Sequence, residues 1–263
     1  MSDPLLLSAH HDAVLRLTLN RPAARNALSV GLMEALQAAL DNAAKDRFLR
    51  AIIIAANGVA FCSGHDLKEM TVRRADADKG RAAFAALFAQ CSKLMQTIMR
   101  HPLPVIAQVQ GAATAAGCQL VASCDLAVAS DAARFATPGA NIGLFCSTPM
   151  VALSRNVSRK AAMEMLLTGE MIEAQEARRI GLVNRVVAAS ALADETMALA
   201  QKIASKPRAT VKTGKEAFYR QLEMPLAEAY DYASRVMTEN MLHAEAEEGI
   251  CAFVEKREPK WPA

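Results

Sequence analysis

The chain has 263 residues, a length that fits one large α/β domain or two small ones, and its 52% apolar content is enough for a sizeable core. With 30 Lys and Arg against 27 Asp and Glu, the net charge of +3 gives no electrostatic reason to expect a nucleic acid or an anionic membrane as partner. Charge or Gly interrupts every apolar run before the roughly 20 residues that a membrane span requires, so we expect no membrane partner.

Targeting, redox and metal signals are missing from the sequence. Residues 1–11 contain no basic segment ahead of an apolar stretch, which predicts a cytoplasmic location. The six cysteines lack paired spacing, so we interpret them as reduced thiols. The histidines lack metal-ligand spacing, and we therefore expect neither a metal nor another cofactor.

The first half of the chain alternates between strand and helix patterns. Leu15–Leu19 shows the period of two of a strand near a sheet edge, and Ser29 is a candidate N-cap for a helix that ends near Lys45. The continuous apolar run Ala51–Ala56 is typical of a buried parallel strand. The same reading gives strands at 105–109 and 126–129, with helices at 81–99 and 114–123 between them.

Beyond Thr148 the pattern is almost wholly helical, and no repeat or linker interrupts it. We predict an α/β core over residues 1–190 and a C-terminal helical region of the same domain over residues 191–263. The expected helices are 160–167, 174–180, 191–205, 210–222 and 226–248.

Two local features suggest a binding site. The loop 61–67 leaves a buried strand, and Gly64 lets the backbone approach a ligand, so the amide of His65 can point into a site. The segment 111–120 follows the strand at 105–109 through small residues, which brings a helix N-terminus to the carboxyl edge of the sheet, where it suits an oxyanion. Each feature also has a purely structural reading, as a strand-exit turn and as tight helix packing.

Two further segments follow these features along the chain. They are Cys124–Ala129 with Phe135–Gly143, and Leu167–Glu170 leading to Gly181–Val183. In this order the chain resembles the enoyl-CoA hydratase/isomerase (crotonase) family. The resemblance runs from Asn20-Arg21-Pro22 to Phe253–Arg257 and covers nearly the whole chain.

The resemblance implies a crotonase-type spiral of β-β-α turns with a C-terminal helical layer that builds a homotrimer or a dimer of trimers. It also implies an acyl-CoA substrate whose thioester carbonyl is held by the backbone amides of His65 and Ala116. The resemblance nominates further substrate-binding positions, with Lys256 coming from a neighbouring subunit: Arg25, Ala27, Ser63, Gly64, Asp66, Leu67, Gly117, Cys146 and Lys256.

One departure from the family pattern concerns catalysis. Hydratases of this family carry two glutamates where this chain has Gln119 and Gly139, and neither residue accepts a proton at neutral pH. We therefore expect weak or absent hydratase activity, which the double change of both positions to Glu should raise. The Cys146 thiol is one candidate replacement. The nearest carboxylates, Asp66 and Glu69, are interpreted as solvated or capping groups, and the His65 side chain as a spectator because the family uses only the backbone there.

Three hypotheses follow: an acyl-CoA enzyme of the lyase or isomerase class that works without the glutamates, an acyl-CoA-binding pseudoenzyme, and an RNA-binding relative. The small net charge argues against the last. Whether the chain is an enzyme therefore stays open at the level of sequence.

Overall fold

Six strands form the larger of two sheets in the computed structural model, which describes residues 3–261. Strand β1 pairs antiparallel with β2, and the other neighbours are parallel. The continuous apolar runs predicted to be buried parallel strands are the central strands of this sheet, which confirms that reading. In spatial order the strands are β1 (Leu6–His11), β2 (Val14–Leu19), β3 (Ala51–Ala56), β5 (Val105–Val109), β7 (Leu126–Ser130) and β10 (Arg185–Val187).

A second sheet of four short strands lies beside the first. Strands β3 and β4, β5 and β6, and β7 and β8 follow one another along the chain, so each turn contributes one strand to each sheet before the chain becomes helical again. The predicted spiral of β-β-α turns is confirmed. Its short strands were not predicted, because two or three residues are too few to show a period: β4 (Ala60–Cys62), β6 (Ala112–Thr114), β8 (Arg134–Ala136) and β9 (Ile172–Glu173).

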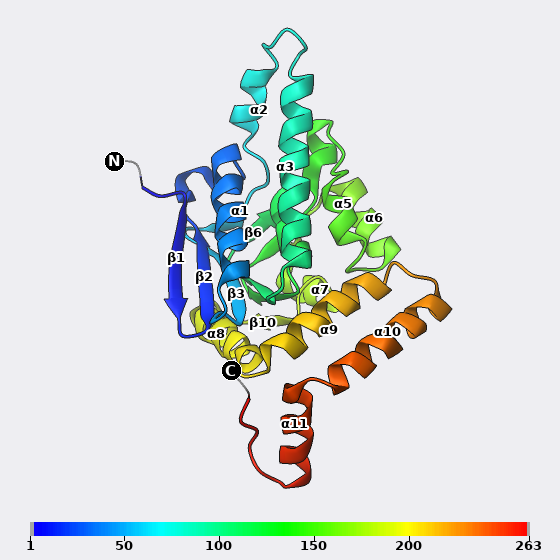
Figure 1. Cartoon of the computed structure of the whole chain (residues 1–263). Helices are drawn as coiled ribbons and strands as arrows, with labels where there is room; N and C mark the ends of the chain where they lie inside the picture. Colours follow the sequence, from blue (N-terminus) through cyan, green and yellow to red (C-terminus); the bar gives the residue numbers. More distant parts are fainter. Residues whose placement is uncertain (1–2, 262–263) are drawn as a thin grey trace.

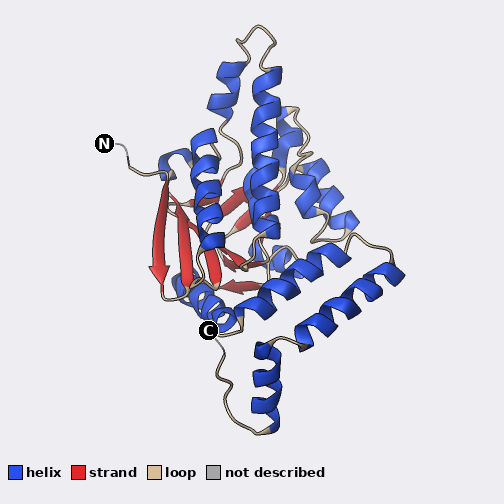
Figure 2. Ribbon diagram, viewed as in Figure 1, coloured by secondary structure: helices blue, strands red, loops and turns tan. Residues whose placement is uncertain are grey.

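Helices surround both sheets (Figure 2). The predicted N-cap is confirmed, since Ser29 Oγ accepts the Leu32 N–H at 3.2 Å. The predicted single helix over 226–248 was wrong: His243 is extended, and the chain forms two helices there. The α-helices are α1 (Val30–Lys45), α2 (Leu67–Arg73), α3 (Arg81–Arg100), α4 (Ala116–Ser123), α5 (Pro149–Leu153), α6 (Arg159–Thr168), α7 (Ala174–Arg179), α8 (Leu192–Ala204), α9 (Arg208–Gln221), α10 (Leu226–Met241) and α11 (Ala244–Val254).

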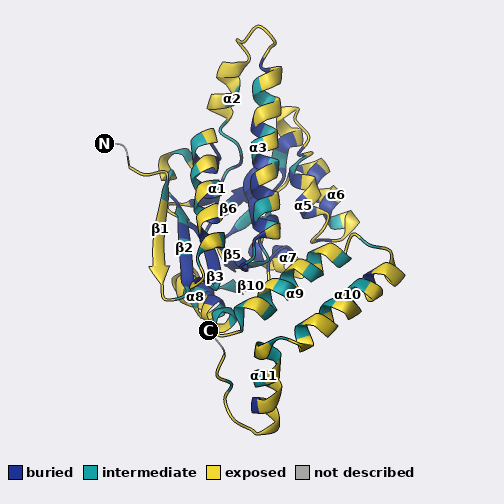
Figure 3. Ribbon diagram, in the orientation of Figure 1, coloured by how far each residue is buried: buried dark blue, intermediate teal, exposed yellow. Residues whose placement is uncertain are grey.

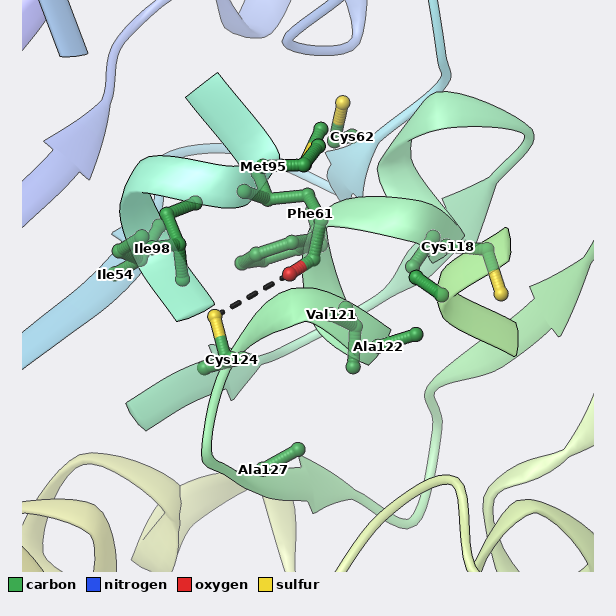
Figure 4. Close-up of a cluster of buried hydrophobic side chains, with 14 of the residues drawn as sticks. Ile54, Phe61, Cys62, Met95, Ile98, Cys118, Val121, Ala122, Cys124 and Ala127 are labelled. Carbon is green, nitrogen blue, oxygen red and sulfur yellow. Dashed lines mark hydrogen bonds between the residues drawn. The ribbon is translucent and has the colours of Figure 1, made fainter. Parts of the chain in front are cut away.

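The core lies on both faces of β3. Ile52 and Ile54 face the larger hydrophobic cluster, whereas Ile53 faces a smaller cluster with α8. Figure 4 shows part of the larger cluster, where Phe61 of β4 lies between side chains of α3 and α4. Because α4 is fully buried, its first turn is held rigidly at the end of the second sheet.

The C-terminal helices contrast with this core. Helices α10 and α11 extend away from the sheets (Figure 1) and are coloured largely as exposed in Figure 3. Their exposed apolar side chains include Leu226, Met237 and Phe253. Within residues 3–261 no helix is both long and apolar enough to cross a membrane. The division at residue 190 stays a prediction.

Candidate functional site

An apolar cavity of about 450 Å³ lies where β4 and β6 end. These strands are parallel neighbours, so the loops that follow them meet at one edge of the sheet. Of the residues predicted from the sequence, six line this cavity, namely Ser63, His65, Leu67, Ala116, Gly139 and Cys146.

Backbone hydrogen bonds hold the loop after β4 from two sides. The Ser63 N–H donates to the Arg25 carbonyl at 3.1 Å, and the Leu28 N–H donates to the Gly64 carbonyl at 2.7 Å. On the other side, the Thr114 hydroxyl donates to the Ser63 carbonyl at 3.1 Å. The loop is therefore a fixed part of the cavity wall.

The His65 and Ala116 amides lie on these two facing loops. A Cβ at Gly64, which has φ +98°, would lie 2.9 Å from Ala115 Cβ and 3.4 Å from the Ala116 nitrogen, so the loops nearly touch. Ala115 itself has φ 50° and ψ −120°, a strained conformation that sets the direction of the following amide. Within residues 3–261 neither the His65 nor the Ala116 N–H donates a hydrogen bond to a backbone or side-chain acceptor.

Gly117 serves packing rather than the cavity. A Cβ on Gly117 would lie 2.1 Å from the Cys62 carbonyl oxygen, so only glycine lets α4 approach β4 this closely. The structural reading of the small residues in this segment therefore applies, because the helix packs tightly against β4; the oxyanion reading stays a prediction.

Gly139 has no room for a side chain. A Cβ there would lie 1.9 Å from the Leu144 carbonyl oxygen and 2.8 Å from Cys146 Sγ. A glutamate at this position would therefore require the loop to shift, and the expected gain in hydration from the double change stays a prediction. The Cys146 thiol accepts the Gly139 N–H at 3.3 Å, and burial raises the pKa of Cys146 despite that hydrogen bond, so the group is a protonated thiol at neutral pH.

Two predicted polar residues are turned away from the cavity. Gln119 does not line it; its side chain is buried and faces the Cys91 thiol, with Oε1 4.0 Å from Sγ. Asp66 caps α2 and pairs with Arg21 at 2.9 Å. Burial opposes the Asp66 charge, but the Arg21 guanidinium and the helix amides outweigh it and lower the pKa of Asp66. These contacts exclude Asp66 as a replacement acid.

Other predicted binding residues do not line the cavity. The exposed Arg25 contributes only its carbonyl, which accepts the Ser63 N–H, and Ala27 is buried. Gly64 shapes the wall without lining the cavity. Lys256 follows α11, at the opposite end of the molecule from α2 (Figure 1). A role for Lys256 in the same subunit's site does not fit this arrangement.

Most of the apolar residues that line the cavity were not predicted from the sequence. Phe88 of α3 meets the His65 ring edge to face, with centroids 5.6 Å apart and planes at 72°. Its helical spacing in an amphipathic segment was the available signal, but spacing does not show which face meets a cavity. Other apolar lining residues that were not predicted include Met70, Pro138 and Ile142.

A second hollow, of about 510 Å³, lies between α1 and α3. Its lining includes exposed charged side chains of α3, Lys93 and Arg100, and it is separate from the His65 cavity. Ligand sites are mainly apolar with few polar groups, which favours the His65 cavity as the functional one. Across residues 3–261 no group of three His, Cys, Asp or Glu side chains is placed to hold a metal ion.

The fold and the cavity agree with a family assignment. Residues 9–263 match the family described as enoyl-CoA hydratase/isomerase, and the chain belongs to this family. The sequence resemblance is thus confirmed at the level of family and fold.

Individual relatives are similar along nearly the whole of this chain. The chain is 51% identical to human "Enoyl-CoA hydratase domain-containing protein 3, mitochondrial", over 99% of this chain and 84% of the relative. The crystal structure of that human protein superposes with a TM-score of 0.93 and 49% identity, covering 98% of this chain and 100% of that one. An enoyl-CoA hydratase structure from Mycobacterium smegmatis gives 0.94 and 55%, covering 98% and 99%.

The predicted cytoplasmic location is contradicted by these relatives, because the mouse, human and rat proteins are named mitochondrial. The prediction failed because mitochondrial import depends on a targeting signal, and such a signal contributes nothing to folding. Composition and core patterning therefore carry no information on compartment.

Proposed function

We propose that this protein binds a coenzyme A thioester in the cavity and polarises its carbonyl with the amides of His65 and Ala116. The observation that carries the proposal is that both N–H groups, on adjoining loops at a mainly apolar cavity, have no acceptor within residues 3–261. Two convergent amides stabilise the oxyanion of an enolate, and one such donor is typically worth about 10²–10³ in rate. A family described as enoyl-CoA hydratase/isomerase supports an acyl-CoA ligand.

The test is a comparison of affinities by calorimetry. A coenzyme A thioester should bind more tightly than free coenzyme A, because only the thioester presents a carbonyl to the two amides. Gly64→Ala should abolish that difference, since its methyl group would push the two loops apart. Gly143→Ala is the matched control: Gly143 also has a positive φ, but a Cβ there meets open space. Equal affinities in the unmodified protein would contradict the proposal.

Turnover separates an enzyme from a pseudoenzyme. The cavity lining holds neither Gln119 nor any carboxylate among the described residues, which supports slow hydration of crotonyl-CoA. We propose an enolate-forming reaction of the lyase or isomerase class instead. Incubation with a panel of acyl-CoAs, followed by mass spectrometry, tests this: conversion of any member supports an enzyme, and binding without conversion supports the pseudoenzyme.

We also propose a trimer or a dimer of trimers. The apolar side chains exposed on α10 and α11 support burial against another subunit. Sedimentation at micromolar concentration tests it, and a stable monomer would contradict it.

A further inference from the structure

The direction of the His65 amide depends on the peptide bond that carries it. The loop that holds this bond lies between two partners: the Ser63 carbonyl accepts the Thr114 hydroxyl on one side, and the Gly64 carbonyl accepts the Leu28 N–H at 2.7 Å on the other. The Gly64–His65 peptide is trans, so its N–H points opposite to its carbonyl. The hydrogen bond to Leu28 therefore turns the His65 amide away from Leu28, toward the side of the loop where Thr114 lies.

Leu28 binds the same loop a second time. The Asp66 N–H donates to the Leu28 carbonyl at 3.3 Å, which completes a parallel bridge between Leu28 and His65 outside the named strands. A strand pairing of this length is marginal by itself in water. Other contacts must therefore hold the two segments in register.

The Arg21 guanidinium connects these two segments. Its Nη1 donates to the Ala27 carbonyl at 2.6 Å, and its Nη2 donates to the Asp66 carboxylate at 2.9 Å. One planar group thus joins the residue before Leu28 to the residue after His65. The Arg21 and Asp66 side chains are only 20% and 11% exposed, so water competes little for these charge-assisted hydrogen bonds.

We propose that Arg21 is a positioning residue for the oxyanion site, because its two-armed guanidinium fixes the Leu28–His65 bridge and with it the direction of the His65 amide. The inference rests on the proposed thioester function. Arg21 is not among the residues that line the cavity, so it acts through the backbone of the two segments that it joins. Arginine suits this role since its donors lie in a rigid fork, whereas a lysine ammonium is a compact charge without that fork.

The carbonyl stretch of bound butyryl-CoA, measured by isotope-edited infrared spectroscopy, reports on this role. Hydrogen bonds from two amides polarise the thioester carbonyl, so binding to the wild-type protein should lower its stretching frequency. In Arg21→Met the frequency should return part of the way to that of free butyryl-CoA. The preference for butyryl-CoA over free coenzyme A, measured by calorimetry, should fall by about 2- to 10-fold, the usual value of one hydrogen bond.

Arg134→Met is the matched control. Arg134 also bonds a carboxylate with one arm of its guanidinium and a backbone carbonyl with the other, Glu173 at 3.2 Å and Ala133 at 3.0 Å. Neither Arg134 nor these two partners line the cavity. The carbonyl frequency and the thioester preference of this variant should equal those of the wild type.

Arg21→Lys separates positioning from stability. Lysine restores a positive charge beside Asp66 but not the fork, so this variant should resist urea better than Arg21→Met does, while its bound carbonyl frequency stays raised. It also provides a second variant should Arg21→Met fold poorly.

Two results would overturn the role of Arg21 and leave the thioester function standing. The first is a wild-type carbonyl frequency and preference in folded Arg21→Met or Arg21→Lys. The second is an equal change in Arg134→Met, which would show that loss of any such arginine disturbs the site. A wild-type protein with neither a lowered carbonyl frequency nor a thioester preference would instead contradict the proposed function, and the inference would fail with it.

Discussion

Two buried polar sites in this protein are satisfied in opposite ways. In the first, the Lys215 ammonium of α9 lies 2.6 Å from the Asp125 carboxylate and donates to the Ile98 and Leu103 carbonyls at 3.1 Å each. The Tyr219 hydroxyl donates to the other Asp125 oxygen at 2.9 Å. The Lys215 and Asp125 side chains are only 8% and 14% exposed. In the second site, both His65 nitrogens lack a partner within residues 3–261.

The two sites differ in what their polar groups contribute to the fold. The Lys215–Asp125–Tyr219 cluster joins α9 to the short segment between α4 and β7, so its hydrogen bonds hold the fold together. The two His65 ring nitrogens, by contrast, make no hydrogen bond within residues 3–261. Removing polar groups from the two sites should accordingly have opposite effects on stability.

The largest expected effect comes from Lys215→Met. The substitution leaves the Asp125 carboxylate buried without its counter-charge, which typically costs about 3–5 kcal/mol of unfolding free energy. Urea denaturation measures it. Lys215→Met combined with Asp125→Asn should recover much of the loss, because no charge is then stranded. A loss below about 1 kcal/mol in the single variant would show that the cluster is not an anchor.

Gly139→Ala should have the next largest effect. Its methyl group would collide with the Leu144 carbonyl, so the cavity loop must shift, at about 1–3 kcal/mol. Gly214→Ala is the control: Gly214 lies within α9, where a Cβ meets open space, and alanine should stabilise the helix by about 0.5–1 kcal/mol. Equal losses in the two variants, measured by urea denaturation, would contradict the steric account. The same collision predicts no gain in crotonyl-CoA hydration from Gly139→Glu.

The sequence predicted the main elements because burial and period determine them. The run Ala51–Ala56 and the Ser29 cap are local signals, and both are present in the structure. That the loops of His65 and Ala116 lie together followed from the family resemblance, since no local pattern shows which loops share a sheet edge.

The details of the cavity were harder to predict. Nothing in the local sequence indicates that Gln119 faces Cys91 or that the Leu144 carbonyl fills the space beside Gly139, because both depend on how a loop folds back. The spectator interpretation of the His65 side chain came from the family and not from this chain. The structure leaves that interpretation as a prediction, and adds that both ring nitrogens are buried without a partner within residues 3–261.

His65→Leu should leave the protein as stable as before or stabilise it by on the order of 1 kcal/mol. The leucine removes two buried nitrogens that have no partners and keeps an apolar group against Phe88. Urea denaturation without ligand measures the change. A loss of more than about 2 kcal/mol would show that the imidazole has a structural role, as Lys215 does.

The smallest expected effect is a change in the pH dependence of stability. The His65 pKa is lowered in the folded state, whereas the unfolded chain titrates near 6.5. Above that value both states hold a neutral ring, so the group contributes no pH dependence. As pH falls below it, the unfolded chain takes up a proton first, and stability declines by at most about 1.4 kcal/mol per pH unit for one histidine. The buried His101, whose pKa burial also lowers, acts in the same direction.

His65→Leu should therefore retain the His101 contribution and lose the other. Between about pH 6.5 and pH 5.5 its unfolding free energy should fall less steeply than that of the wild type, by up to about 1 kcal/mol over the interval. The carboxylates with lowered pKa, such as Asp66, titrate well below this range and are common to both proteins. Parallel pH profiles would mean that the ring is protonated as readily in the folded protein as in the unfolded chain. A ring of that kind has found water or a partner in solution, and the contrast with the Lys215 cluster would then no longer hold.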